Sequence, residues 1–222
     1  MERPRRDLAS LPRGLDARYT ALVAAVAPAI EAALSPAVSA NRVLVSGLRP
    51  PVLRLAPWRA ERGAFVRRLS ALAAAGTCLA LADVRDCYGS IRADVVERAL
   101  ARLGCGRNEV AAVGGFLRGM SALGVRGLPV GPDPSAVLAN AVLAEVDSAL
   151  ESVGARHLRW VDDVVVALDH PAAARRVVAT VAEALDRLGL SLNEAKTRVV
   201  LDPGAVERAG TLSMAGPSST VG

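Results

Sequence analysis

The spacing of apolar residues along the chain predicts a mixture of helices and short strands. Apolar residues repeat with helical periodicity in six segments, at about residues 16–34, 59–75, 92–103, 108–121, 134–152 and 171–188. Shorter apolar or alternating runs predict strands over residues 42–48, 78–82, 157–160, 164–168 and part of 190–201. The chain contains no internal repeat. The pattern therefore indicates an α+β fold in which helices back a sheet.

Three aspartates stand where predicted strands end or turn. The apolar run of residues 78–82 leads directly to Asp83, whereas Asp162 and Asp163 lie between two strand-like segments, as a hairpin turn would. Asp-Asp is not among the dipeptides that favour such turns, which indicates a functional demand. Arg159 is the only cation within the apolar arms of this hairpin.

The chemistry of these three carboxylates predicts metal binding. Neighbouring carboxylates in an apolar hairpin repel one another and are costly to desolvate unless a cation neutralises them. If the strand before Asp83 lies beside the hairpin, Asp83, Asp162 and Asp163 form a site for two Mg²⁺ or Mn²⁺ ions. The plainer alternative is that each aspartate is an ordinary turn residue.

Length and composition limit the choice of fold and ligand. A chain of 222 residues suits one domain, or one domain with a smaller appendage. Hydrophobic residues make up 52% of the sequence but aromatic residues only 3%, so the core must consist mainly of Ala, Val and Leu. Aromatic platforms for stacking nucleic-acid bases are therefore not expected.

Charge is distributed unevenly along the chain. The formal net charge is +5, but residues 1–80 hold 12 Arg against 5 acids, whereas residues 81–222 are net acidic. A basic front half could bind phosphate backbones and an acidic back half could hold metal cations. Of the 27 basic residues, 26 are Arg, and a coding bias could explain that preference but not the segregation. Lys196 is the only lysine.

Cysteine usage and hydropathy predict a cytoplasmic protein. Cys78, Cys87 and Cys105 are odd in number and lack the spacing of a zinc site or a disulfide framework, which fits a reducing compartment. The apolar segment of residues 19–40 is interrupted by Pro28, Glu31 and Pro36. We therefore expect no membrane span and no signal peptide.

Four segments resemble, in order, the palm motifs of reverse transcriptases, the RNA-directed DNA polymerases. Residues 83–91 (DVRDCYGSI) are similar to the first motif, and residues 127–140 (GLPVGPDPSAVLAN) are similar to the second. Residues 160–163 (WVDD) resemble the third motif and residues 188–197 (LGLSLNEAKT) the fourth. Four motifs in the family's order are far more specific than any one of them.

The resemblance implies a domain organisation. We expect a polymerase palm over residues 77–203, with an antiparallel sheet backed by helices. Residues 1–76 would form a basic N-terminal and fingers-like region of reduced size, and residues 204–222 a flexible tail. The thumb that grips product duplex in this family is expected to be missing or vestigial.

The resemblance also implies catalytic roles. Asp83, Asp162 and Asp163 would hold two divalent metal ions for phosphoryl transfer. Lys196 would contact or protonate the leaving pyrophosphate, the alternative being a chance surface lysine.

Three further residues fall at nucleotide-binding positions of the family. The ring of Tyr88 would lie under the incoming sugar and exclude a 2′-hydroxyl, although it could simply pack at a helix entrance. Gly131 would let the backbone approach the nucleotide or template. Ser135 would bind the nucleotide, or be an ordinary polar residue at a helix start. The sequence departs from the family at Val130, where Gln is common, and at Trp160, where Tyr or Phe is usual.

The function implied is RNA-directed DNA synthesis from deoxynucleoside triphosphates, on an RNA template and from a DNA or RNA primer. The compact form and the Gly-Pro-x-Pro-Ser pattern resemble bacterial defence-associated or unclassified reverse transcriptases, which implies a role in antiviral defence. A protein partner or a homo-oligomer would supply the thumb function. Two alternatives stay open: non-templated or protein-primed synthesis, and a non-catalytic nucleic-acid-binding palm module.

Overall fold

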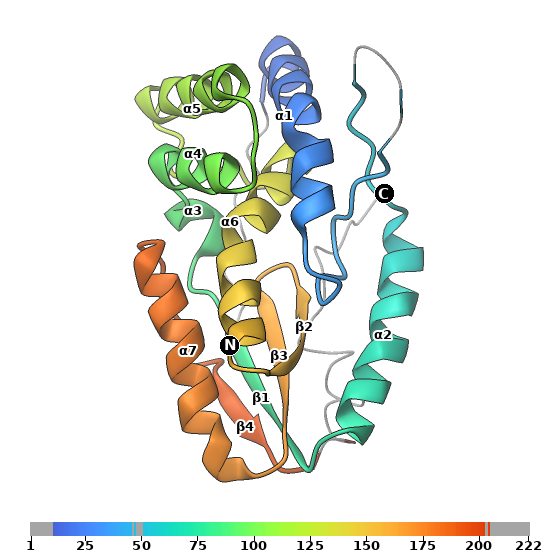
Figure 1. The fold of residues 1–222 in the computed structure, drawn as a ribbon. Coiled ribbons are helices and arrows are strands. Elements are labelled where there is room, and N and C mark those ends of the chain that lie inside the picture. The colour runs from blue at the N-terminus through green and yellow to red at the C-terminus, as the bar shows by residue number, and fades with distance from the viewer. Residues whose placement is uncertain (1–10, 46, 48–50, 203, 205–222) are drawn as a thin grey trace, which may run out of the picture.

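A four-stranded antiparallel sheet lies at the centre of the computed structural model, which describes residues 11–45, 47, 51–202 and 204 (Figure 1). The strand order is β2-β3-β1-β4. The strands span β1 (Cys78–Asp83), β2 (Arg156–Trp160), β3 (Asp163–Leu168) and β4 (Arg198–Val200). Strands β2 and β3 form a hairpin, whereas β1 pairs with β3 and β4, which follow it much later in the chain.

Seven α-helices surround this sheet in the described part of the chain. They are α1 (Arg13–Ala33), α2 (Trp58–Ala74), α3 (Cys87–Ser90), α4 (Ala93–Arg102), α5 (Arg107–Ala122), α6 (Asp133–Ser152) and α7 (Ala174–Arg187), with a 3₁₀ turn η1 (Pro171–Ala173) before α7. The six predicted helices are confirmed to within a few residues, and the α+β fold is confirmed. The short helix α3 was not predicted. None of the described helices is both long enough and apolar enough to cross a membrane.

The two faces of the sheet carry different cores. On one face, the inward residues of β1 and β3 pack against α6 and α7 in a core of Ala, Val and Leu side chains. On the other face, Leu158, Trp160 and Val165 pack against Phe65 and Leu69 of α2. Helix α2 therefore lies on the opposite side of the sheet from α7 (Figure 1). This alternation follows from the two-residue period of side chains along a strand.

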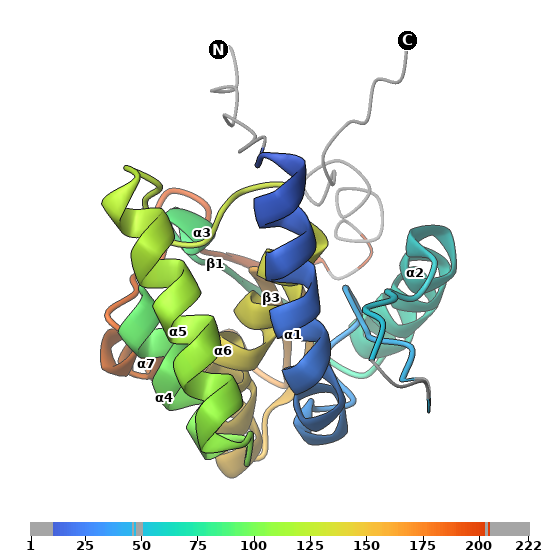
Figure 2. The same cartoon turned by 90° about the horizontal axis from the view of Figure 1, so that it is seen from above.

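Helices α1, α4 and α5 form a further layer over α6 (Figure 2). Tyr19 of α1 stacks on Phe116 of α5 with ring centroids 4.9 Å apart. Helix α6 is buried on nearly every side, which suits a segment composed mainly of Ala, Val and Leu.

The predicted strand at residues 42–48 is wrong for the residues described there. Val43 makes only an isolated bridge to Leu55. The amide N–H of Arg42 donates to the Glu61 carboxylate at 2.8 Å, and that of Val43 donates to the Glu31 carboxylate at 2.9 Å. Carboxylates from two helices thus take the donors of Arg42 and Val43, and the backbone pairing is limited to the two hydrogen bonds that flank the bridge. Residues 46 and 48 lie outside the described part.

Candidate active site

Two of the three aspartates face each other across adjacent strands. The register pairs Asp83 of β1 with Asp163 of β3, and Asp163 with Trp160 of β2. Because cross-strand partners share a face, these three side chains form a row across the sheet on the side of α2. The predicted neighbourhood of Asp83 and the hairpin is therefore confirmed.

Segment 188–197 completes the row at Asp83. The Lys196 ammonium donates to Oδ2 of Asp83 at 2.9 Å, and the Asn193 side-chain amide donates to Oδ1 at 2.8 Å. The backbone N–H of Asn193 also donates to the Asp83 carbonyl at 2.8 Å. The first and fourth motifs are thus joined by backbone and side chains. Sequence reasoning missed Asn193, although the residue lies within the fourth motif.

The aspartates are electrostatically coupled. The pKa of Asp163 is raised to about 7, mainly by burial and also by the negative charges of Asp162 and Asp83, against the opposing charge of Lys196. A hydrogen bond to Asp83 also favours the protonated form of Asp163. The carboxylates therefore repel one another in the folded protein, as the sequence predicted, and a bound cation would relieve this repulsion.

The donor set fits a hard divalent cation in its chemistry. Carboxylate oxygens are the ligands that Mg²⁺ and Mn²⁺ prefer. Among the described residues, no three His, Cys, Asp or Glu side chains converge as they stand on a point where an ion would be held. Both oxygens of Asp83 instead receive hydrogen bonds from Lys196 and Asn193. Asp83, Asp162 and Asp163 could hold such ions if Lys196 left Asp83.

The hairpin turn lies one residue earlier than predicted. Strand β2 ends at Trp160 and β3 begins at Asp163, so Val161 and Asp162 form the two-residue loop. Asp163 belongs to β3 because it pairs with Asp83 of β1 and with Trp160 of β2. Val161 adopts a left-handed conformation with φ 57°, which costs a β-branched residue about 1–3 kcal/mol. The turn is thus strained, in agreement with the unfavourable choice of residues.

The second motif is held against the first by backbone contacts. The Leu128 N–H donates to the Tyr88 carbonyl at 2.8 Å. Gly127 has φ 65°, and a Cβ there would lie 2.2 Å from the Tyr88 carbonyl oxygen, so only glycine fits. Gly131 also has a positive φ, 119°. The contact of Gly131 with a nucleotide remains a prediction.

Ser135 and Tyr88 differ in their access to a ligand. Ser135 is fully buried and its hydroxyl lies 3.0 Å from the Tyr19 hydroxyl, so its side chain packs α6 against α1. Tyr88 is half-buried at the edge of the main core. The nucleotide-binding roles of both remain predictions.

The basic residues of α2 are divided between solvent and structure. Arg59 and Arg67 are exposed. Arg68 instead donates to the Ser39 hydroxyl at 2.7 Å, and the Arg62 guanidinium lies 5.4 Å from the centroid of the Trp160 ring. Arg62 and Arg68 are therefore half-buried and contact neighbouring segments.

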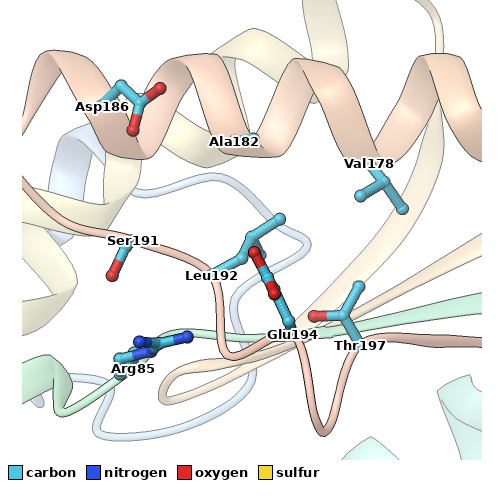
Figure 3. A pocket seen from close by; sticks show the side chains of 8 residues that line it. All are labelled: Arg85, Val178, Ala182, Asp186, Ser191, Leu192, Glu194 and Thr197. Carbon is cyan, nitrogen blue, oxygen red and sulfur yellow. The ribbon is translucent and has the colours of Figure 1, made fainter.

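A hollow of about 570 Å³ lies between α7 and the loop before β4 (Figure 3). It is lined by Arg85, Val178, Ala182, Asp186, Ser191, Leu192, Glu194 and Thr197. Its lining includes none of Asp83, Asp162 and Asp163.

Comparison with known proteins identifies the class to which this palm-like sheet and its carboxylates belong. The model of the reverse transcriptase family, described as RNA-dependent DNA polymerase, matches residues 14–216. The chain therefore belongs to the reverse transcriptase family. Members of this family are described as RNA-dependent DNA polymerases and generally use divalent metal ions.

Solved structures also match. Forty-seven chains do so. One belongs to the structure of telomerase from Candida albicans in complex with the TWJ fragment of telomeric RNA, with 12% sequence identity and a TM-score of 0.46. The match covers 62% of this chain and 30% of that chain, so this chain spans less than a third of the telomerase length. No curated protein matches.

Proposed function

We propose that this chain is an RNA-directed DNA polymerase that adds deoxynucleotides to a primer 3′-hydroxyl with two Mg²⁺ or Mn²⁺ ions. The observation that carries the proposal is the cross-strand pair of Asp83 and Asp163, coupled to Asp162 and Lys196, in a chain of the reverse transcriptase family. Buried carboxylates that repel one another lower the stability of a fold unless cations neutralise them. Cation binding would explain why this chain holds three of them together.

Asp83, Asp162 and Asp163 would hold the ions. Ions bound there would lower the pKa of the primer hydroxyl and neutralise charge on the triphosphate during in-line transfer. Lys196 would leave Asp83 when a cation arrives and donate to the leaving pyrophosphate, for which its flexible, titratable ammonium is suited. Asn193 would keep one Asp83 oxygen oriented during this exchange.

Residues near the first and second motifs would select the nucleotide. The Tyr88 ring would exclude a 2′-hydroxyl, and Gly131 would leave room for the nucleotide beside the backbone. Ser135 would support the nucleotide site indirectly, because its hydrogen bond with Tyr19 holds the start of α6 in place. Its predicted direct contact with the nucleotide requires that hydroxyl to change partner.

The wider role forms part of the same proposal. The palm would extend over residues 77–203, after a basic fingers-like region at residues 1–76. The template would be RNA, the primer DNA or RNA, and a protein partner or second copy would support the product duplex. A cytoplasmic role in bacterial antiviral defence is proposed from the Gly-Pro-x-Pro-Ser pattern at residues 131–135. The tail proposed for residues 204–222 lies outside the described residues except for Gly204.

Incorporation of labelled deoxynucleotides on a primed RNA template tests the proposal. Asp162→Asn should abolish product in Mg²⁺ while leaving thermal stability intact, and Asp169→Asn, beyond the far end of β3, should retain it. Full activity of Asp162→Asn would refute the assignment. Product formed without template would identify non-templated synthesis, and nucleic-acid binding without any product would identify a non-catalytic palm.

A further inference from the structure

Arg159 carries a fully buried charge beside the turn formed by Val161 and Asp162. It lies in β2, and its side chain points away from the row of carboxylates toward α6, with 0% exposure. Its guanidinium forms a bidentate ion pair with Asp147 of α6, with N···O distances of 3.0 and 2.7 Å. A buried ion pair is weak evidence for stability, because apolar replacements are often equally stable. Its presence here calls for another explanation.

The ion pair keeps Asp147 ionised inside the core. Burial alone would raise the pKa of Asp147, but the Arg159 charge and hydrogen bonds from His157 and Arg159 outweigh it, so the pKa lies below its ordinary value. The His157 ring nitrogen lies 3.3 Å from the same carboxylate. The guanidinium is thus held on one side by a fixed negative charge.

The free end of the same guanidinium reaches the strained turn. Nη1 of Arg159 donates to the Val161 carbonyl at 2.8 Å and to the Asn140 side-chain oxygen at 2.9 Å. The Val161 carbonyl belongs to the peptide that leads into Asp162, and Val161 has the left-handed φ of 57°. Fixing that carbonyl fixes the plane of the peptide from which the Asp162 side chain departs.

Asn140 ties this arrangement to the segment after α1. Its amide donates to the Ala40 carbonyl at 2.8 Å. The same segment runs beside β2, where the Arg159 N–H donates to the Ala37 carbonyl and the Ser39 N–H donates to the Arg159 carbonyl, each at 3.0 Å. Arg159 is therefore held through both its backbone and its side chain, by α6 and by residues 37–40.

We propose that Arg159, held by Asp147 and Asn140, is a positioning residue that sets the Val161–Asp162 peptide so that Asp162 and Asp163 present their carboxylates to divalent cations. This inference rests on the proposed function. Residues that orient metal ligands through hydrogen bonds typically change metal affinity or activity by about 10–100-fold when lost.

The first test replaces the ion pair with apolar side chains of similar size, in the double variant Arg159→Met with Asp147→Leu. The matched control is Arg156→Met with Asp169→Leu, which removes an exposed ion pair at the far end of the same hairpin. Two properties are measured: the affinity for Mn²⁺ alone by electron paramagnetic resonance, and kcat and KM for primer extension. We expect the core variant to lose about 10–100-fold in Mn²⁺ affinity and in kcat, with nucleotide KM unchanged. The control should match wild type in both properties.

A second variant covers the case in which the apolar pair does not fold. Arg159→Lys keeps the positive charge beside Asp147 but cannot form the bidentate pair and reach the Val161 carbonyl together. We expect it to remain folded and to lose Mn²⁺ affinity. Adding Val161→Gly, which removes the penalty for the left-handed conformation, should recover part of that loss.

The outcomes separate this inference from the proposed function. Wild-type Mn²⁺ affinity and kcat in Arg159→Lys would overturn the positioning role even if its melting temperature fell. A loss of kcat with unchanged Mn²⁺ affinity would also overturn it. If wild type itself neither bound Mn²⁺ nor extended a primer, the proposed function would fail instead.

Discussion

Replacing Asp163 with asparagine should stabilise the cation-free protein while removing its activity. The pKa of Asp163 is raised from 3.8 to about 7 in the folded chain, first by burial and then by Asp162 and Asp83. Between these two values the folded state binds more protons at this site than the unfolded state. Stability contributed by the protonated group is therefore complete below about pH 4 and is lost as the pH rises through 7.

The size of the effect follows from the shift. A difference of about three pKa units corresponds to about 4 kcal/mol of unfolding free energy between pH 4 and pH 8. An asparagine at this position is neutral at every pH, and its amide can donate to Asp83 as the protonated Asp163 does. Asp163→Asn should therefore equal wild type near pH 4 and exceed it by up to about 4 kcal/mol at pH 8. In a chain of this size that difference raises the melting temperature by about 10 °C.

Thermal and urea unfolding in the presence of a chelator, at pH 4 to 8, would measure this difference. Asp169→Asn serves as the control because its carboxylate is exposed and pairs with Arg156 at the surface, so its effect should stay below about 1 kcal/mol. Adding Mg²⁺ at pH 8 should stabilise wild type more than Asp163→Asn. A stability difference that is independent of pH, or a destabilised Asp163→Asn, would show that the carboxylates do not oppose folding.

Three other substitutions test the neighbouring contacts. Tyr88→Ala should lower the ratio of kcat/KM for deoxynucleotides over ribonucleotides, and an unchanged ratio would contradict sugar selection. Lys196→Met should raise the affinity for Mn²⁺ alone, because the competing cation on Asp83 is removed, while lowering kcat; calorimetry and primer extension measure the two, and a fall in affinity would refute the competition. Gly127→Ala should destabilise the fold by about 1–3 kcal/mol and lower activity, because its Cβ meets the Tyr88 carbonyl in a left-handed backbone. Gly124→Ala, with a similar φ but nothing near the Cβ, separates strain from collision in the same melting assay.

The helices and most strands could be predicted because their signals are local. Apolar periodicity within a segment determines which face is buried, and it located α1, α2 and α4 to α7 within a few residues. The placement of the three aspartates at strand ends and in the hairpin could be predicted because strand ends and ordered motifs are also visible in sequence. The strand predicted at residues 42–48 does not form as expected because Glu61 and Glu31 accept from the backbone N–H groups of Arg42 and Val43, which no local pattern reveals.

The charged core could not be predicted for a related reason. A lone arginine in an apolar strand is normally expected at the surface or against the neighbouring acids. The partners of Arg159 are Asp147 and Asn140, which lie on a helix and become neighbours only when α6 crosses the sheet. Similarly, Asn193 reaches Asp83 from 110 residues away. Local patterns locate the carboxylates, but tertiary packing decides which side chains control them.

The position of β1 in the sheet has a consequence for how the protein acquires its shape during synthesis. Both neighbours of β1 come from later parts of the chain, and the contact between Asp83 and Lys196 spans 113 residues. A nascent chain that has emerged only as far as α6 would hold β1 with neither edge paired, so the sheet cannot close until residues near 200 leave the ribosome. Such long-range pairing slows folding. The carboxylate site should therefore be among the last parts of the molecule to form. A ribosome-stalled chain ending before Asn193 should contain all three aspartates yet leave Asp83 without its two side-chain donors.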